Sequence, residues 1–304
     1  MDVLQNIIAL NDSLSGAALE IGTQVWIDGR LDSLNLQGYQ ITTLPENISN
    51  LQALKHLSLS DTKLTHLPTS IGYLSSLKGL ALAGIELTSI PESIGNLSSL
   101  EILSLRRNLL SSIPESIGNL AKLKMLGFGI NQIKSIPESI FKLDSLLYLG
   151  LSENQLTSLP DNLGDLSSLT ILRLNHNQLT SIPESIGNLS SLKELGIDYN
   201  QLTSIPESIG NLSTLTSLYL SENQLTSIPE SIGNLSSLTK LWICCNQLNS
   251  VPDCIGNLSS LVELSISHNQ ITGEIPVEVC NLLESNNLYI SFIFEGNNLT
   301  NTCD

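Results

Sequence analysis

A 23-residue unit that recurs eleven times between Leu31 and Glu284 is the feature that most constrains the fold of this chain. The copy that begins at Leu215 reads LTSLYLSENQLTSIPESIGNLSS and is typical of the others. A fixed period of this length predicts a solenoid, in which each unit packs only against its neighbours. We therefore expect one elongated repeat domain, although a chain of 304 residues could hold two globular domains.

Leucine or isoleucine recurs within each unit at a spacing that changes along it. Leu218 and Leu220 flank one outward residue, which is strand alternation, whereas the later apolar positions are three or four apart, as in a helical turn. Pro229 suits the first position of that turn because it has no N–H to leave unpaired, and Gly233 can end it. Each coil should therefore hold a strand and a short helical segment, with neighbouring strands paired in parallel.

The motif LxxLxLxxNxL, followed by IPESIGNLSSL in several copies, resembles the leucine-rich repeat family, in its typical repeats of the bacterial, archaeal and plant Ras-group-related kind. The resemblance covers residues 31–284. It implies an α/β fold, a right-handed horseshoe solenoid with a concave parallel β-sheet and short helical or 3-10 segments on the convex side. It also implies an asparagine at position 9 of each unit, whose amide satisfies backbone groups. The first three copies have Tyr39, Thr62 and Ile85 there, so we expect their turns to be less regular.

Residues 1–30 lie outside the repeats and predict an N-terminal cap made of a helix and a hairpin strand. Val3, Leu4, Ile7 and Ile8 fall on one helical face. A strand then leads into an Asp28-Gly29 turn signal. We expect this cap, through Trp26, to cover the open edge and the apolar end of the first repeat.

Residues 285–304 predict a C-terminal cap that contains a degenerate twelfth repeat. Its pattern is carried by Tyr289, Phe292, Phe294, Asn297 and Leu299. Cys280 and Cys303 flank this segment and could be bridged, as the caps of secreted relatives often are. Two free buried thiols are the alternative, and the residues alone leave both open.

The chain is acidic, with a formal net charge of -16 and only 13 Lys and Arg residues. Because phosphate groups are bound by clustered Lys and Arg, this balance disfavours nucleic acids and anionic membrane surfaces as partners. No apolar run approaches the roughly 18 residues that span a bilayer, so we expect no membrane insertion. The opening MDVLQNIIALNDSL lacks the basic start of a signal peptide. This predicts a cytoplasmic protein, or a secreted or cell-surface one if an export signal was removed.

Function is expected where the copies differ. In the family, positions 3, 5, 7 and 8 point from the concave sheet and the following turn into solvent. At position 5 small residues give way to large ones, in the order Asn35, Ser58, Ala81, Ser104, Gly127, Gly150, Arg173, Gly196, Tyr219, Trp242 and Ser265. Exposed Tyr, Trp and Arg dominate binding energy at protein interfaces. We predict a partner-binding surface made of Tyr148, Arg173, His176, Glu194, Asp198, Tyr199, Tyr219, Glu222, Lys240 and Trp242.

Within this surface, Arg173, Tyr199, Tyr219 and Trp242 would anchor the partner. Glu194, Asp198 and Glu222 would then select its basic groups. The alternative is that outward strand positions favour aromatic residues for cross-strand packing alone.

Position 8 brings Glu222, Cys245 and His268 into successive coils, which raises the possibility of a metal site or a Cys-His nucleophile. No closed ligand set or third orienting group accompanies them, so coincidence on a variable surface is the better explanation. We find no phosphate loop, nucleophile elbow or complete metal set, and predict a protein without enzymatic activity or cofactor. The predicted function is a monomeric scaffold that binds a protein or peptide on its concave face. The alternative is a secreted or surface protein that recognises a glycan or a host receptor.

Overall fold

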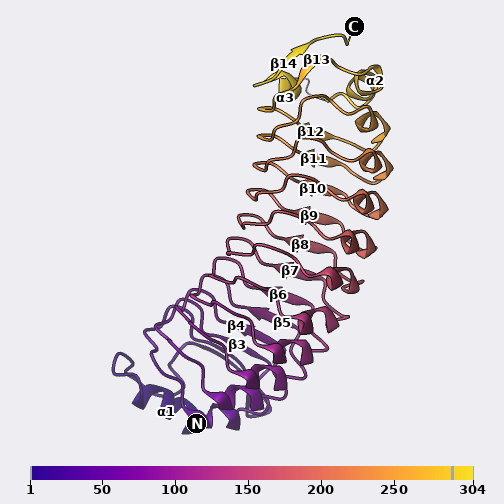
Figure 1. The fold of residues 1–304 in the computed structure, drawn as a ribbon. Helices are drawn as coiled ribbons and strands as arrows, with labels where there is room; N and C mark the ends of the chain where they lie inside the picture. The colour runs from indigo at the N-terminus through magenta and orange to yellow at the C-terminus, as the bar shows by residue number, and fades with distance from the viewer. Residues whose placement is uncertain (1, 289–290, 304) are drawn as a thin grey trace. The chain divides into compact units, whose positions relative to one another are not determined.

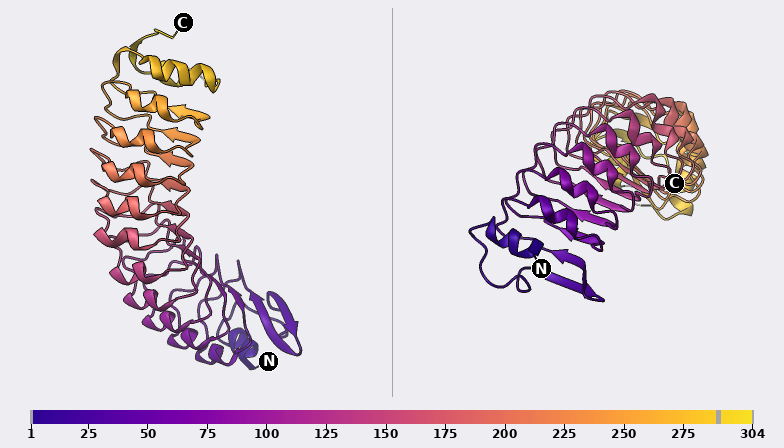
Figure 2. Two further views of the ribbon diagram at one scale, coloured as in Figure 1. Left: turned by 90° about the vertical axis from the view of Figure 1, so that its right-hand side faces the viewer. Right: turned by 90° about the horizontal axis from the view of Figure 1, so that it is seen from below.

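The computed structural model describes residues 2–288 and 291–303, apart from the side chains of residues 291 and 292. Its backbone forms two compact units, residues 1–155 and residues 156–304. Within each unit, strands line one side of the coils and short 3-10 segments line the other (Figures 1 and 2). The alternation of strand and helical turn that the repeat predicts is therefore confirmed.

The first unit begins with helix α1 (Asp2–Ala9) and an antiparallel hairpin of β1 (Thr23–Ile27) and β2 (Arg30–Asn35). The following strands pair in parallel in chain order, and they are β3 (His56–Ser58), β4 (Gly79–Ala81), β5 (Ile102–Ser104), β6 (Met125–Gly127) and β7 (Tyr148–Gly150). The 3-10 segments are η1 (Glu46–Asn50), η2 (Thr69–Tyr73), η3 (Glu92–Asn96), η4 (Glu115–Asn119) and η5 (Glu138–Lys142).

The second unit repeats the same coil. Its 3-10 segments are η6 (Asp161–Asp165), η7 (Glu184–Asn188), η8 (Glu207–Asn211), η9 (Glu230–Asn234) and η10 (Asp253–Asn257). Its parallel strands are β8 (Ile171–Arg173), β9 (Glu194–Gly196), β10 (Ser217–Tyr219), β11 (Lys240–Trp242) and β12 (Glu263–Ser265). Helix α2 (Val277–Ser285), helix α3 (Ser291–Phe294) and the parallel pair β13 (Thr272–Glu274) and β14 (Asn298–Thr300) follow.

The core of each unit is a column of mostly aliphatic side chains, one set from every coil, with Phe128 and Phe141 buried among them in the first unit. In the coil that begins at Leu215, the side chains of Leu218, Leu220 and Ile232 are fully buried. A single coil of this size cannot bury enough apolar surface to offset the entropy of ordering its residues, so its stability comes from the neighbours that share this core.

A ladder of asparagines at position 9 ties each coil to the one before it. Asn246 is buried; its Oδ1 accepts the N–H of Leu225 at 3.0 Å, and its Nδ2 donates to the carbonyls of Leu220 and Ile243 at 3.0 and 3.1 Å. One amide thereby satisfies three backbone groups that the turn leaves unpaired. The ladder consists of Asn108, Asn131 and Asn154 in the first unit and Asn177, Asn200, Asn223, Asn246 and Asn269 in the second.

The first three coils lack this asparagine, and the structure shows what replaces it. Thr62 donates its hydroxyl to the carbonyl of Leu59 at 2.8 Å, and Asn108 of the fourth coil reaches back to the N–H of Ile85 at 3.3 Å. The third coil has two residues with positive φ, Gly84 and Glu86, where the fourth to tenth coils have one, at position 8. By this measure the predicted irregularity is confirmed for the third turn but not for the first two, where Gly38 and Asp61 have the positive φ at position 8 that the later coils share.

The repeat proline and glycine have roles other than those predicted. Pro229 is the extended residue that precedes η9 and is not its first residue. Gly233 does not end the helix; it lies within η9, and its φ is not in the left-handed region. The equivalent Gly210 shows the reason for a glycine, because a Cβ there would lie 2.4 Å from the backbone oxygen of Ser231 in the next coil. Close stacking of coils requires this glycine.

The N-terminal segment matches the predicted elements but not the predicted role of Trp26. Val3, Leu4 and Ile7 of α1 are buried, so the helix covers the apolar end of the stack. Trp26 is 38% exposed, and its indole N–H donates to Gln24 Oε1. Strand β1 pairs with β2 on one side, which moves the open edge of the sheet outward by one strand.

At the C-terminal end, residues 291–294 form the helical turn α3 where a twelfth repeat would have placed a strand. Tyr289 lies outside the described residues. Asn297 nevertheless acts as a ladder asparagine, since its Oδ1 accepts the N–H of Ile271 at 3.3 Å and its Nδ2 donates to the carbonyl of Ile266 at 3.0 Å. A disulfide joins Cys280 in α2 to Cys303, which decides between the two alternatives that the sequence left open.

Candidate functional site

The strands of the second unit hold the outward residues in two straight rows. Adjacent parallel strands pair residue by residue, so Glu194, Ser217, Lys240 and Glu263 align at position 3. Gly196, Tyr219, Trp242 and Ser265 align at position 5 in the same way. The register of the repeat therefore places side chains 23 residues apart in direct cross-strand contact.

Tyr219 and Trp242 form the aromatic centre of this face. Their ring centroids lie 5.1 Å apart, and the rings meet edge to face at 78°. Trp242 is 41% exposed although it is a large apolar side chain, whereas Tyr219 is half-buried. The pair joins two strands and still presents aromatic surface to solvent, so both packing and binding fit its geometry.

His176 and Tyr199 form a second aromatic pair in the turn after the strands. Their rings stack at 4.1 Å with an angle of 9° between planes. Both residues have positive φ, 56° and 55°, a left-handed conformation that is uncommon for residues other than glycine. The N–H of each donates to a carbonyl of the next coil, at Asp198 and Ser221 respectively. These backbone hydrogen bonds between coils thus hold the residue at position 8 in a conformation that exposes its side chain.

Two ion pairs cross the face. Arg173 Nε donates to Glu194 Oε1 at 2.9 Å, and Lys240 Nζ donates to Glu263 Oε1 at 2.7 Å. The bond to Glu263 raises the pKa of Lys240. Because its charge is compensated by Arg173 within the chain, Glu194 is less available to a basic group of a partner than the sequence suggested.

Asp198 is mostly withdrawn from solvent. Its carboxylate accepts hydrogen bonds from Asn175 Nδ2 at 2.5 Å and from the N–H of Ser221 at 3.0 Å. Burial raises the pKa of this carboxyl above its ordinary value. These bonds join three successive coils, so Asp198 orders the turn as well as bordering the predicted surface.

In the column of Glu222, Cys245 and His268, the thiol is not activated by its neighbours. Burial, followed by the neighbouring Glu222 and Cys244, raises the pKa of the Cys245 thiol to about 12. At neutral pH this thiol is protonated and therefore a poor nucleophile. His268 faces Glu295 at 3.5 Å. Among the described residues, no group of three or more His, Cys, Asp or Glu side chains is arranged to hold a metal ion.

Tyr148 is the one predicted residue that belongs to the first unit. It lies in β7, and its ring covers Gly150, where a Cβ would lie 2.7 Å from the Tyr148 hydroxyl oxygen. The other nine predicted residues all belong to the second unit, on its strands or the turns that follow them. Sequence reasoning did not predict the two ring contacts among them, His176 with Tyr199 and Tyr219 with Trp242, although each pair is 23 residues apart and the repeat spacing could have revealed it.

Comparison with known proteins agrees with this architecture. The profile of the family described as leucine-rich repeat region matches residues 29–112, 102–199 and 184–303. No curated protein matches the chain. Within the described residues, none of the helices has the length and apolar character needed to cross a bilayer.

Three solved structures illustrate the similarity. A leucine-rich repeat protein of Leptospira interrogans has a TM-score of 0.81 and 33% identity, over 98% of this chain and 76% of its own. The ectodomain of a membrane receptor kinase of Arabidopsis thaliana, in complex with Casparian strip integrity factor 2, has a TM-score of 0.74 and 34% identity, over 85% of this chain and 32% of its own. A plant peptide hormone receptor in complex with RGF2 has a TM-score of 0.77 and 34% identity, over 88% of this chain and 44% of its own.

The chain therefore spans less than half of the length of either plant receptor. The family profile, in contrast, matches every residue from 29 to 303 in three overlapping ranges. The repeat pattern, the ladder and the profile agree, and this protein belongs to the leucine-rich repeat family.

Proposed function

We propose that the protein is a non-enzymatic interaction scaffold and that the strand face of residues 156–304 binds a partner protein or peptide. The observation that carries this proposal is the exposure of Trp242 on strand β11 and of Tyr199 in the turn after β9, at 41% and 49%, since neither ring belongs to the buried core. Aromatic side chains that are partly exposed and held rigid lose little entropy on binding, which makes them effective anchors.

The similar receptor structures support this proposal in general terms. The two plant receptors, at 34% identity, are in complex with RGF2 and with Casparian strip integrity factor 2. Proteins of this fold are typically interaction modules without enzymatic activity. We propose that this chain acts as a monomer, since the stacked coils supply a binding face without a second copy.

Affinity capture with a matched pair of variants tests the proposal. Tyr219→Ala combined with Trp242→Ala should reduce capture of the partner from the native cell by roughly tenfold or more. Tyr73→Ala is the control, because this tyrosine is 64% exposed but lies in η2, on the helical side of the first unit. Undiminished capture by the double variant, with circular dichroism unchanged, would contradict the assignment.

A second candidate is an exported or surface protein that recognises a glycan or a receptor, in place of a cytoplasmic scaffold. The disulfide between Cys280 and Cys303 favours it, because disulfides persist mainly in oxidising compartments. Two of the three free cysteines are compatible with it: burial raises the pKa of Cys254 to about 11, and that of Cys245 is also raised, so neither of these thiols oxidises readily.

Intact mass of protein isolated from its native source separates the two candidates. A bridged protein gains two hydrogens on reduction, whereas an unbridged one does not change. Export would be supported by a bridge together with recovery outside the cytoplasmic fraction.

A further inference from the structure

The strand face of the first unit differs from that of the second in having a floor of small side chains. Strands β3 to β6 align Ser58, Ala81, Ser104 and Gly127 at position 5. A hollow of about 300 Å³ lies over β2 to β5, and its lining includes His56, Gly79, Ala81 and Ile102. Because no large side chain rises from this floor, the backbone of another chain could approach the sheet closely.

One side of this floor carries exposed apolar side chains. Ile102 and Met125 are paired in register on β5 and β6, and each is 44% exposed. Neither belongs to the core, which is formed by the inward Leu103 and Leu126 of the same strands. Two adjacent exposed apolar residues beside a hollow are typical of a binding surface.

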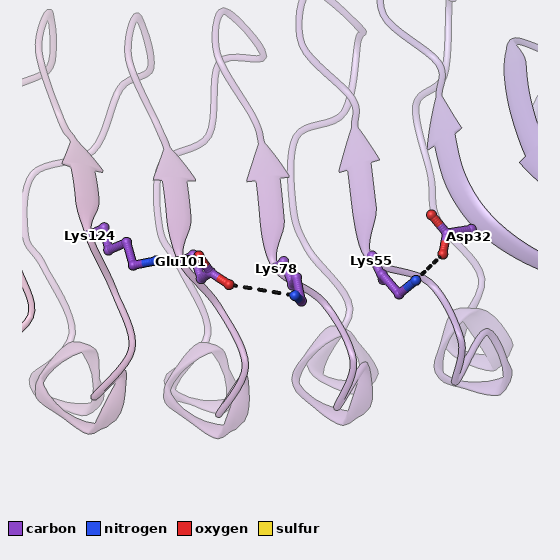
Figure 3. Close-up of polar contacts among 5 residues, drawn as sticks. All are labelled: Asp32, Lys55, Lys78, Glu101 and Lys124. Atoms are coloured by element: carbon purple, nitrogen blue, oxygen red, sulfur yellow. Dashed lines mark hydrogen bonds and ion pairs between the residues drawn. The ribbon is translucent and has the colours of Figure 1, made fainter.

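A row of lysines marks the edge of the floor where the strands begin. Figure 3 shows Asp32, Lys55, Lys78, Glu101 and Lys124 in one line, one from each of five successive coils. Lys55 pairs with Asp32 at 2.5 Å, while Lys78 and Lys124 share Glu101 at 3.7 and 2.7 Å. The hydrogen bond from Lys124 lowers the pKa of Glu101.

The row has more positive than negative groups, and its lysines remain accessible. The side chains of Lys55, Lys78 and Lys124 are 44%, 50% and 52% exposed. An ammonium group has three donors, and each of these ion pairs uses only part of that capacity. The edge can therefore bind further carboxylates without breaking its internal pairs.

Arginines lie at the opposite edge, where the strands end. Arg106 and Arg107 follow β5 at positions 7 and 8, and both are exposed. The stem of Arg106 leans toward the next coil, where a Cβ on Gly129 would lie 3.8 Å from its Cγ. At β5 the floor is thus bordered by cations on both sides, while the exposed Asp61 after β3 is an acidic residue at the same edge as the arginines.

We propose that this lysine-edged groove, defined by the small floor of β3 to β6 and by Lys55, Lys78, Lys124 and Arg106 at its borders, binds an extended acidic peptide segment of a partner protein. Four strands about 4.8 Å apart span about 15 Å, the length of roughly five residues of extended chain. Carboxylates of the segment would meet the lysines and arginines, and small or apolar side chains would lie against the floor and Ile102.

This groove is separate from the aromatic surface of the proposed function, and neither depends on the other. The probe for the test is a labelled, end-blocked peptide of about eight residues that alternates glutamate and alanine. Its binding to the full chain is followed by fluorescence anisotropy. Its glutamine counterpart and a single-stranded oligothymidine of similar length are the comparison ligands.

We expect the glutamate peptide to bind roughly tenfold more tightly than the glutamine peptide, and its affinity to fall as NaCl is raised. Ala81→Trp fills the floor and should weaken binding by about tenfold or more. Lys78→Gln with Lys124→Gln removes charge without adding bulk and should weaken it about fivefold. The lysine variants decide the matter if Ala81→Trp does not fold.

The matched control is Lys240→Gln, which removes a lysine from the second unit and should leave peptide affinity unchanged, as should Tyr219→Ala with Trp242→Ala. Equal affinity for the glutamate and glutamine peptides would overturn the proposal. So would an equal loss of affinity in the Lys240→Gln control. Oligothymidine binding as tight as that of the glutamate peptide, with the same sensitivity to the lysine variants, would also overturn it, in favour of a general polyanion site.

Discussion

The two units share one scaffold but differ sharply in charge. Residues 1–155 contain ten Lys and Arg against fourteen Asp and Glu, whereas residues 156–304 contain three against fifteen. The formal net charge is therefore -4 for the first unit (ten minus fourteen) and -12 for the second (three minus fifteen). An acidic or a basic partner would experience different fields at the two strand faces, although the coils beneath them are nearly identical.

The faces differ in relief as well as in charge. The first unit presents Ser58, Ala81 and Gly127 at position 5, where the second presents Tyr219 and Trp242. Core positions are nearly invariant between units because every coil must bury the same aliphatic set. Residues at outward positions do not contribute to the core, so their identities can differ from coil to coil. A single solenoid can therefore carry two chemically distinct surfaces.

The ladder asparagines give the largest expected effect and test whether the scaffold is common to both units. Asn108→Ala and Asn223→Ala should each cost about 4 kcal/mol, because each leaves buried backbone groups unpaired. Thr62→Ala should cost only about 1 kcal/mol, since the hydroxyl of Thr62 makes a single bond to Leu59. Urea denaturation measures all three. Unequal costs for the two asparagines would break the idea of a shared scaffold.

The fold could be predicted from the sequence because its causes are local and repeated. Alternating leucines, the proline before each 3-10 segment and the ladder asparagine recur often enough to fix the coil. The role of Gly210 could not be read in this way, because it depends on the distance between two coils and not on the conformation of one. A helical turn in place of the twelfth strand was missed for a similar reason: its sequence still follows the repeat pattern.

The candidate site was predicted as a set of residues but not as a set of contacts. Tyr219 and Trp242 could be placed together because the period aligns them. The ion pair of Arg173 with Glu194 and the withdrawal of Asp198 depend on side-chain conformations that the pattern does not encode. The lysine row was missed because its members lie at position 2, which the family motif does not mark as outward.

The glycine that lies within most of the 3-10 segments should matter equally in both units, because the coils stack at the same distance in each. Gly95→Ala and Gly210→Ala should each cost about 3 kcal/mol, because the new Cβ would lie 2.3 or 2.4 Å from a backbone oxygen of the next coil. Gly127→Ala is the control, since nothing lies within 4 Å of a Cβ built there. Thermal unfolding checks the three variants. A loss of stability in the control as large as in the other two would remove the steric explanation.

The disulfide distinguishes the C-terminal end of the second unit from the rest of the chain. Cys280→Ser with Cys303→Ser should lower stability by about 2 kcal/mol, because the bond closes a segment of 23 residues. The effect should be confined to this end, so hydrogen exchange should accelerate in α2 and β14 and remain unchanged in β3 to β6. Acceleration throughout the first unit would show that the two units unfold as one.

A pH dependence specific to the second unit is the smallest expected effect. Burial raises the pKa of Asp198 in the folded state above the ordinary aspartate value of about 3.9. The folded state therefore binds this proton more tightly than the unfolded state. The resulting stability is fully present below the unfolded pKa and is lost as pH rises through the folded pKa.

Asp198→Asn should remove this loss of stability with rising pH while keeping an oxygen for the N–H of Ser221. The equivalent position of the third coil, Ala83, has no titratable group. Urea titrations from about pH 3 to pH 8 check the difference. A variant that loses stability over this range as steeply as the wild type would show that the dependence arises elsewhere.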